Sequence, residues 1–162
     1  LGQCRFIFFT EWTRGLSGKL RRRLELAFER EGLDFSRYVS FLPWLTKPAF
    51  LGLMQRADVC LDTIGFSGFN TALQAMQCGL PVVTVQGRFL RGRLASGILR
   101  RVGLHELVAH DEDQYVALAA RLLRDHDYRD EMRRRIEENR HFLFEDIAPV
   151  RALEDFLAAR AG

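Results

Sequence analysis

A glycine-rich turn before a helix holds the residues of this 162-residue chain that are best suited to ligand chemistry. The turn and helix start read GFSGFNT at positions 65–71, and they follow the apolar run ADVCL at 57–61. Gly65 and Gly68 allow positive φ angles or a close approach to a ligand. The free N–H groups and the dipole at a helix start attract an anion. The pattern therefore predicts a phosphate site, to which the side chains of Asn70 and Thr71 add hydrogen bonds.

The same residues also fit a purely structural interpretation. Asn and Thr are preferred helix N-caps, so an ordinary strand-to-helix turn would use Asn70 or Thr71 in that way. The spacing is neither the GxGxxG of dinucleotide-binding folds nor a Walker motif, which argues against both of those nucleotide sites. Spacing alone leaves the phosphate site and the plain cap open.

Two more loops follow predicted strands, TEWTRGLSG at 10–18 and PWLTK at 43–47. Lys47 is one of only two lysines, so it is either a ligand contact or a free surface charge. Aromatic residues near it would stack on a base or simply pack together; they are Phe41, Trp44 and Phe50. The four histidines show no metal spacing, and basic groups with a helix dipole can replace a cation at a phosphate. We therefore expect no metal and no other cofactor.

The elements that must position these loops alternate between strand and helix. Apolar runs predict strands at 5–10, 38–42, 57–61 and 81–85 and a weak one at 106–109. Helical spacing predicts helices between them, including 71–78 and 94–102, and a last helix at 149–159 with its apolar side chains facing the core. Asp111 and Gln114 have capping-box spacing. Such alternation predicts a single Rossmann-like α/β domain over 1–162, with a buried parallel sheet whose ligands bind at the carboxyl ends of the strands.

Composition narrows the class of protein further. Hydrophobic residues make up 48% and charged residues 28%, with a net charge of +3, which is an ordinary globular balance. The arginines alternate with acids, which favours solvated helix faces with i,i+4 pairs over a nucleic-acid surface. Three cysteines without CxxC spacing favour a reducing, cytoplasmic location. No apolar run is long enough to cross a membrane, and no signal peptide is recognised.

The segments ADVCLDT (57–63) and GFNTALQAMQCGLPVVTVQGRFLRGRLASGILRRVGLHELVA (68–109) resemble a known family. It is the nucleotide-sugar-binding half of the O-linked N-acetylglucosamine transferase, or SPINDLY-like, glycosyltransferases. The resemblance runs from about Arg5 to Leu157, and the order LDT, glycine turn, NT, GLPVVT and RGR carries it. It implies the GT-B architecture, in which two Rossmann-like domains enclose the active cleft. This chain would be most of the C-terminal half, without its first strand.

The resemblance also implies roles for particular residues. The positions from Gly68 to Thr71 match the turn that cradles the diphosphate of UDP. Lys47 matches a lysine that reaches the UDP moiety, and Arg93 matches a recurrent arginine. Gln74 stands where the family usually has an acid that bonds the ribose hydroxyls, and Phe69 replaces a common Gly or His. The expected UDP-sugar-binding residues are thus Lys47, Gly68, Phe69, Asn70, Thr71, Gln74 and Arg93, and no catalytic residue is assigned.

These roles imply a donor-binding domain of a protein O-glycosyltransferase. The donor would be UDP-N-acetylglucosamine or a related UDP-sugar, and the acceptor a protein Ser or Thr hydroxyl. The resemblance implies a longer cytoplasmic, bacterial parent with TPR repeats, whose N-terminal half supplies the second wall of the cleft, so the fragment alone would be inactive. The alternative is a Rossmann-like protein-interaction module with a decayed sugar-nucleotide site, which the departures at Gln74 and Phe69 favour.

Overall fold

The computed structural model describes residues 2, 4–10, 15–144 and 146–161. Part of the loop at 10–18 lies outside these residues. Contacts between residues divide the chain into two compact units, Leu1–Phe50 and Leu51–Gly162. The single domain over 1–162 stays a prediction.

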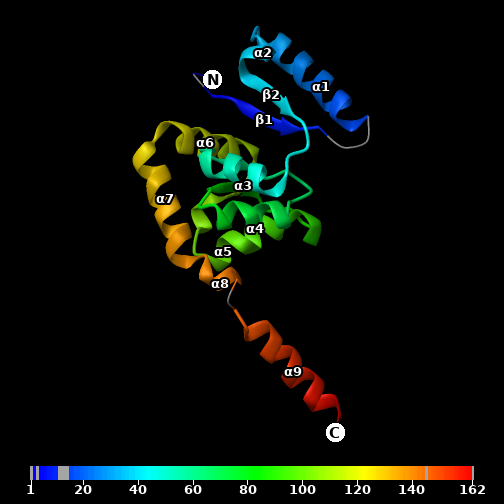
Figure 1. Ribbon diagram of the computed structural model, residues 1–162, viewed down its shortest axis with the longest axis vertical. Helices are drawn as coiled ribbons and strands as arrows, with labels where there is room; N and C mark the ends of the chain where they lie inside the picture. Colours follow the sequence, from blue (N-terminus) through cyan, green and yellow to red (C-terminus); the bar gives the residue numbers. More distant parts are fainter. Residues whose placement is uncertain (1, 3, 11–14, 145, 162) are drawn as a thin grey trace. The chain divides into compact units, whose positions relative to one another are not determined.

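The first unit pairs two parallel strands with two helices (Figure 1). Strand β1 (Phe6–Phe9) pairs in register with β2 (Val39–Leu42), so Phe6 lies opposite Val39. Between them run α1 (Leu16–Arg30) and the unpredicted short helix α2 (Phe35–Tyr38), which the side chain of Asp34 caps. Gly32, at φ +65°, follows the end of α1, where glycine is the usual residue for such a backbone conformation.

Strand β1 is only partly buried, which corrects the prediction of a buried sheet for this run. Ile7 and Phe9 are 39% and 38% exposed, whereas Phe8 is half-buried. Phe8 stacks on Phe41 of β2, and the guanidinium of Arg21 in α1 lies 4.5 Å from the centre of the Phe41 ring. The helices of this unit thus cover one face of the strand pair better than the other.

The second unit contains a three-stranded parallel sheet in the order β3-β4-β5. The strands are β3 (Cys60–Leu61), β4 (Val82–Val85) and β5 (Val108–Ala109). The connecting helices are α4 (Asn70–Gln77) and α5 (Leu94–Arg101), with 3-10 turns at Leu90–Gly92 and His105–Leu107, and α6 (Glu112–Arg124) follows β5. These parallel crossovers confirm the predicted alternation. The core packs around β4 and includes Met76, Leu99, Leu104, Leu107, Leu122, Met132 and Ile136.

Helix α3 (Lys47–Arg56) joins the first unit to the second in sequence. It begins at Lys47, so Pro48 is its second helical residue. Proline is tolerated in a first helical turn because the N–H groups there have no intrahelical acceptor. The preference of a pre-proline residue for extended backbone is therefore overcome at this helix start.

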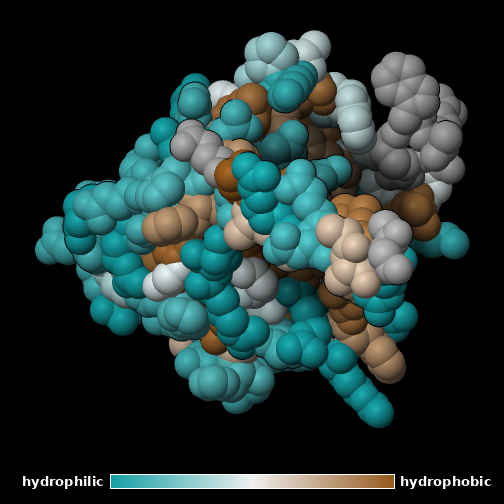
Figure 2. All heavy atoms as spheres, turned by 90° about the horizontal axis from the view of Figure 1, so that it is seen from below, coloured by the Kyte–Doolittle hydropathy of each residue, from teal (hydrophilic) through white to brown (hydrophobic). Residues whose placement is uncertain are grey.

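The C-terminal helices are α7 (His126–Asn139), α8 (His141–Phe144) and α9 (Ala148–Ala161). The predicted inward face of the last helix is wrong: Val150, Leu153, Phe156 and Leu157 are 50–57% exposed. Helical spacing shows that a face is apolar but not what covers it, and no described residue buries this one. Figure 2 shows hydrophobic side chains reaching the surface among hydrophilic ones. No described helix is both long and apolar enough to cross a membrane.

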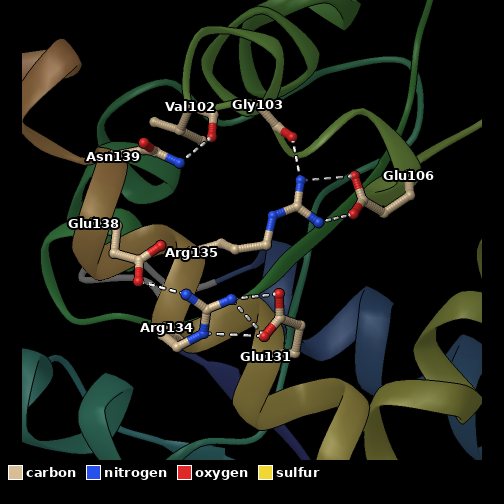
Figure 3. Close-up of polar contacts among 8 residues, drawn as sticks. All are labelled: Val102, Gly103, Glu106, Glu131, Arg134, Arg135, Glu138 and Asn139. Carbon is tan, nitrogen blue, oxygen red and sulfur yellow. Dashed lines mark hydrogen bonds and ion pairs between the residues drawn. The ribbon is translucent and has the colours of Figure 1, made fainter.

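Helix α7 carries arginines of two kinds, as Figure 3 shows. Arg134 lies between Glu131 and Glu138 on the exposed face, which confirms the predicted pairs one turn apart. Arg135 instead donates to the main-chain oxygen of Gly103 and to Glu106. The sequence interpretation of all these arginines as solvated charges is therefore wrong for Arg135.

Four further side chains of α7 and its end also reach main-chain oxygens at the ends of other helices. Arg140 donates to Gln77 at the end of α4, and Asn139 donates to Val102 at the end of α5. The remaining contacts are Arg133 with Gly79 and Ala57, and Arg129 with Leu122. Because the last carbonyls of a helix have no intrahelical donor, α7 satisfies groups that would otherwise need water.

Candidate anion-binding site

The glycine turn lies at the carboxyl end of β3, between that strand and α4. Gly65 has φ +85°, so the expected positive φ is confirmed there. Gly68 does not have a positive φ, and a Cβ atom on it would lie 3.5 Å from the Cβ of Thr71, an ordinary contact. Only the first of the two glycines is therefore required by its own backbone conformation.

Helix α4 begins without a side-chain cap. Its first helical residue is Asn70, and the preceding residue, Phe69, makes no capping hydrogen bond. Asn70 and Thr71 thus occupy the first two helical positions, and the interpretation of either as an N-cap is wrong. Within the described part of the chain, no acceptor bonds the N–H groups of Asn70, Thr71 or Ala72. Because Asn70 and Thr71 are exposed, this helix start is open to a ligand.

The neighbouring helix starts in the second unit are closed. The buried hydroxyl of Ser67 accepts a hydrogen bond from the N–H of Ala95 at the start of α5, at 2.8 Å. Asp111 and Asp125 cap α6 and α7. The predicted cap by Asp111 is thus confirmed, but the reciprocal bond of a capping box is not formed as predicted, because Gln114 accepts from the N–H of His110, one residue before the N-cap. In the first unit, α1 also begins without a side-chain cap, at Gly15.

Asp62 connects the turn to the sheet. This residue, only 7% exposed, directly follows β3. Its Oδ1 accepts from the N–H of Gly68 at 2.8 Å, and its Oδ2 accepts from the hydroxyl of Thr84 in β4 at 2.6 Å. Its main-chain oxygen accepts from the hydroxyl of Tyr115 in α6 at 2.9 Å. Sequence reasoning used Asp62 only as part of the LDT motif; the available signal was a lone acid at the end of an apolar strand.

Burial raises the pKa of two ionisable groups beside this carboxylate. Burial, with a smaller effect from Asp62, raises the pKa of the Cys60 thiol to about 11. A thiol with this pKa is protonated at neutral pH, so Cys60 is not an activated nucleophile. Burial, then the nearby Asp62 and Cys60, also raises the pKa of Tyr115, whose hydroxyl therefore stays a donor to Asp62.

A hollow of about 220 Å³ opens beside the turn. It is lined by Cys60, Leu61, Asp62, Thr63, Phe66, Gly68, Thr71, Ala72 and Val82. Pockets that enclose a whole drug-sized ligand have volumes of roughly 300–1,000 Å³. This hollow therefore has room for one group of a nucleotide sugar, with the rest of the molecule on the open surface.

The loop after β4 is bonded to the glycine turn. The N–H of Ser67 donates to the main-chain oxygen of Arg91 at 2.7 Å. Gly87 donates to Gly92 at 2.7 Å, which closes the loop, and a Cβ on Gly87 would lie only 3.0 Å from the Cα of Gly92. Arg93 follows this closed loop with an exposed side chain, which has no ion-pair partner in the described part of the chain.

The other predicted residues lie in different places. Gln74 is half-buried, one turn beyond the start of α4. Lys47 is exposed at the first position of α3, in the first unit. Phe50 packs edge-on against Phe9, as Phe41 stacks on Phe8, whereas Trp44 is 70% exposed. The structure thus brings Gly68, Phe69, Asn70, Thr71 and Gln74 together on one turn and helix and bonds the loop before Arg93 to them.

Two further observations bear on cofactors and redox chemistry. No group of three potential metal-binding side chains occurs among the described residues. Cys4, Cys60 and Cys78 are all free thiols.

A solved structure shares this fold. A mutant O-GlcNAc transferase of Thermobaculum terrenum superimposes with a TM-score of 0.79 at 30% sequence identity, over 94% of this chain and 29% of that one. The match confirms the predicted fold class, a Rossmann-like α/β domain that forms part of a GT-B transferase.

Sequence relatives agree with this structural match. A UDP-N-acetylglucosamine–peptide N-acetylglucosaminyltransferase of Caenorhabditis elegans is 38% identical over 105 residues, which are 65% of this chain and 9% of the relative. A probable transferase of the same name, SPINDLY of Hordeum vulgare, is 36% identical over 120 residues, or 74% of this chain and 13% of the relative. The chain thus spans only a small part of the relatives it matches.

Residues 22–146 match the family model described as glycosyl transferase family 41. The chain belongs to that family, as its motifs predicted.

Proposed function

We propose that this chain is the donor-binding part of a protein O-glycosyltransferase and binds the UDP moiety of a UDP-sugar at the start of α4. The observation that carries the proposal is the uncapped, exposed helix start beside a hollow at the carboxyl end of β3. Buried parallel sheets bind their ligands at that end, and a free helix start favours phosphate. The names of the relatives make UDP-N-acetylglucosamine the first donor to test.

The proposed chemistry is stabilisation of a leaving group. A Ser or Thr hydroxyl of an acceptor protein attacks the anomeric carbon and gives its proton to a base that the proposal places outside these 162 residues. The bond to the diphosphate breaks, and UDP leaves with an added negative charge. The N–H groups of Asn70, Thr71 and Ala72 point along the helix dipole toward that charge, and the hydroxyl of Thr71 adds a donor. Further positive charge from Lys47 and Arg93 is proposed on the resemblance of their loops. These groups take the place of a metal ion, so none is needed in the proposal.

Binding and transfer are separate properties in this proposal. Glycosyl transfer needs donor and acceptor held in one geometry, which requires both walls of a cleft. The 162 residues are proposed to supply the donor wall, while a second α/β half in a longer cytoplasmic parent supplies the other. Helical repeats of about 34 residues upstream of such a half would support a protein-modifying transferase. We therefore expect UDP binding by the isolated chain without transfer activity.

Calorimetric titration of the chain with UDP tests the proposal. We expect weak binding with the same affinity in EDTA as in magnesium or manganese. Titration with UDP-N-acetylglucosamine under the same conditions then tests the donor. Absence of UDP binding, or binding only with a divalent metal, would contradict the proposed site.

A protein-interaction module with a decayed donor site is the second candidate. Exposed aromatic side chains near the same helix start favour it, since Phe66, Phe69 and Phe89 are 69%, 51% and 59% exposed. Clustered exposed aromatics are typical of protein-binding surfaces. A folded chain that binds neither UDP nor UDP-N-acetylglucosamine would favour this candidate over the donor-binding domain.

A further inference from the structure

The buried carboxylate of Asp62 stands out because it lies beside a helix start proposed to bind an anion. A second negative charge close to a phosphate repels it, and a buried carboxylate is costly unless donors satisfy it. Both oxygens of Asp62 have such donors, the N–H of Gly68 and the hydroxyl of Thr84. A buried carboxylate at this position is therefore better suited to a role other than direct contact with the ligand.

The geometry assigns that role to the bond with Gly68. Gly68 ends the glycine turn and comes two residues before the first residue of α4. Its own φ is not positive and a Cβ on it would make only ordinary van der Waals contacts with Thr71 and Asp62, so no unusual backbone conformation fixes it. The bond of 2.8 Å to Oδ1 of Asp62 anchors it to the end of β3. On the other side, the main-chain oxygen of Asp62 is held by Tyr115 from α6.

We propose that Asp62 is a positioning residue that fixes the start of α4 for the donor phosphate by holding the N–H of Gly68. This inference rests on the proposed function, since it names what orients that site. It also changes the role that the resemblance gives to Gly68: the N–H of Gly68 is engaged by Asp62. The N–H groups free for a phosphate are those of Asn70, Thr71 and Ala72.

The two donors to Asp62 provide a matched comparison. Asp62→Ala removes both hydrogen bonds, whereas Thr84→Val removes only the bond to the sheet and leaves the bond to Gly68. In Asp62→Asn, the amide oxygen can still accept from Gly68 while the amide nitrogen donates to the hydroxyl of Thr84. A positioning role therefore predicts that Asp62→Asn retains UDP binding and that Thr84→Val affects stability alone.

The experiment combines hydrogen exchange, followed residue by residue by NMR, with UDP calorimetry on the 162-residue chain. In Asp62→Ala we expect faster exchange at Gly68. We also expect the Kd for UDP to rise about tenfold, which is the effect of losing one hydrogen bond between the displaced helix start and the charged phosphate. In Thr84→Val and Asp62→Asn we expect wild-type exchange at Gly68 and a Kd within about threefold of wild type, a small loss on the same scale. Should Asp62→Ala not fold, Asp62→Ser replaces it. The serine side chain is one bond shorter than that of aspartate, so its hydroxyl lies farther from the N–H of Gly68.

Each result decides the matter. Unchanged exchange at Gly68 in Asp62→Ala, or equal losses of UDP affinity in Asp62→Ala and Thr84→Val, would overturn the positioning role. If wild type does not bind UDP, the proposed function fails. The exchange comparison still tests whether Asp62, and not Thr84, orders the turn.

Discussion

The two ends of α4 are treated in opposite ways. At its C-terminal end, Arg140 and Arg133 of the α7 segment donate to the main-chain oxygens of Gln77 and Gly79. At its N-terminal end, no side chain of the described residues accepts from the first N–H groups. The ends of α5 and α6 are likewise closed by Asn139 and Arg129, as Figure 3 shows for α5.

The contrast separates stability from function. A helix end closed by a charged donor contributes about 1.5–3 kcal/mol where the groups are buried. An N-cap contributes about 1 kcal/mol, so leaving the start of α4 uncapped forgoes stability that α6 and α7 obtain from Asp111 and Asp125. Free, exposed N–H groups are what an anionic ligand needs. The open end is therefore where binding is expected, and changes at the closed ends should affect folding alone.

The largest expected effect is at a closed end. Arg129 is 9% exposed and donates to the main-chain oxygen of Leu122 at 2.8 Å. We expect Arg129→Met to lower the free energy of unfolding by about 2–3 kcal/mol, because a charged hydrogen bond is lost and a buried carbonyl is left without it. Urea denaturation measures the change. The Kd for UDP of the folded variant should not change.

Arg134 on the same helix is the control for this variant. It is paired with Glu131 and Glu138 on the exposed face. Surface pairs of this kind contribute about 0.5 kcal/mol, so Arg134→Met should be nearly neutral. Equal destabilisation by the two substitutions would show that closing the helix end is not the important contribution of Arg129.

The open end is tested by Thr71→Ala. We expect UDP binding to weaken by about 1–3 kcal/mol, the value of a hydrogen bond to a charged oxygen. The melting temperature should change little, because Thr71 is the second helical residue and caps nothing. Calorimetry and thermal melts on the same preparation separate the two effects.

Asp111→Ala is the mirror image of Thr71→Ala, at a closed helix start. Asp111 accepts from the N–H of Gln114 at 2.8 Å. Its replacement should cost about 1 kcal/mol of stability and leave UDP binding unchanged. A Thr71→Ala variant that melts lower but binds UDP normally would assign Thr71 a structural role and weaken the contrast between the two helix starts.

The order and type of the elements were predictable because strand runs and helix faces are local in sequence. The runs at 5–10 and 81–85 became β1 and β4, and Asp111 caps α6 as its position predicted. The glycine turn was also located correctly, since glycine, Asn and Thr at a strand end have few other uses.

What the sequence could not show are partners distant along the chain. Ser67 closes α5 from 28 residues away, and Arg140 reaches Gln77 across 63 residues. A local pattern contains no information on such pairs, so the arginines of α7 were interpreted as solvated. The same limit explains α9. Its spacing predicts an apolar face, but Leu153 and Phe156 are 57% and 50% exposed in the described chain.

The smallest expected effect concerns Gln74, one turn beyond the open helix start. Its side chain is half-buried on α4, three residues after Thr71, so a ribose attached to a phosphate at the helix start would lie near it. A carboxylate accepts hydrogen bonds from ribose hydroxyls more strongly than an amide does. We expect Gln74→Glu to tighten UDP binding by about 1 kcal/mol. Repulsion from the diphosphate should be smaller than this gain because solvent screens it across the sugar.

Pyrophosphate, which has no ribose, is the matched control ligand, and its affinity should not increase. If calorimetry finds UDP affinity unchanged or weaker in Gln74→Glu, the side chain does not face the ribose, and the protein-interaction module gains support.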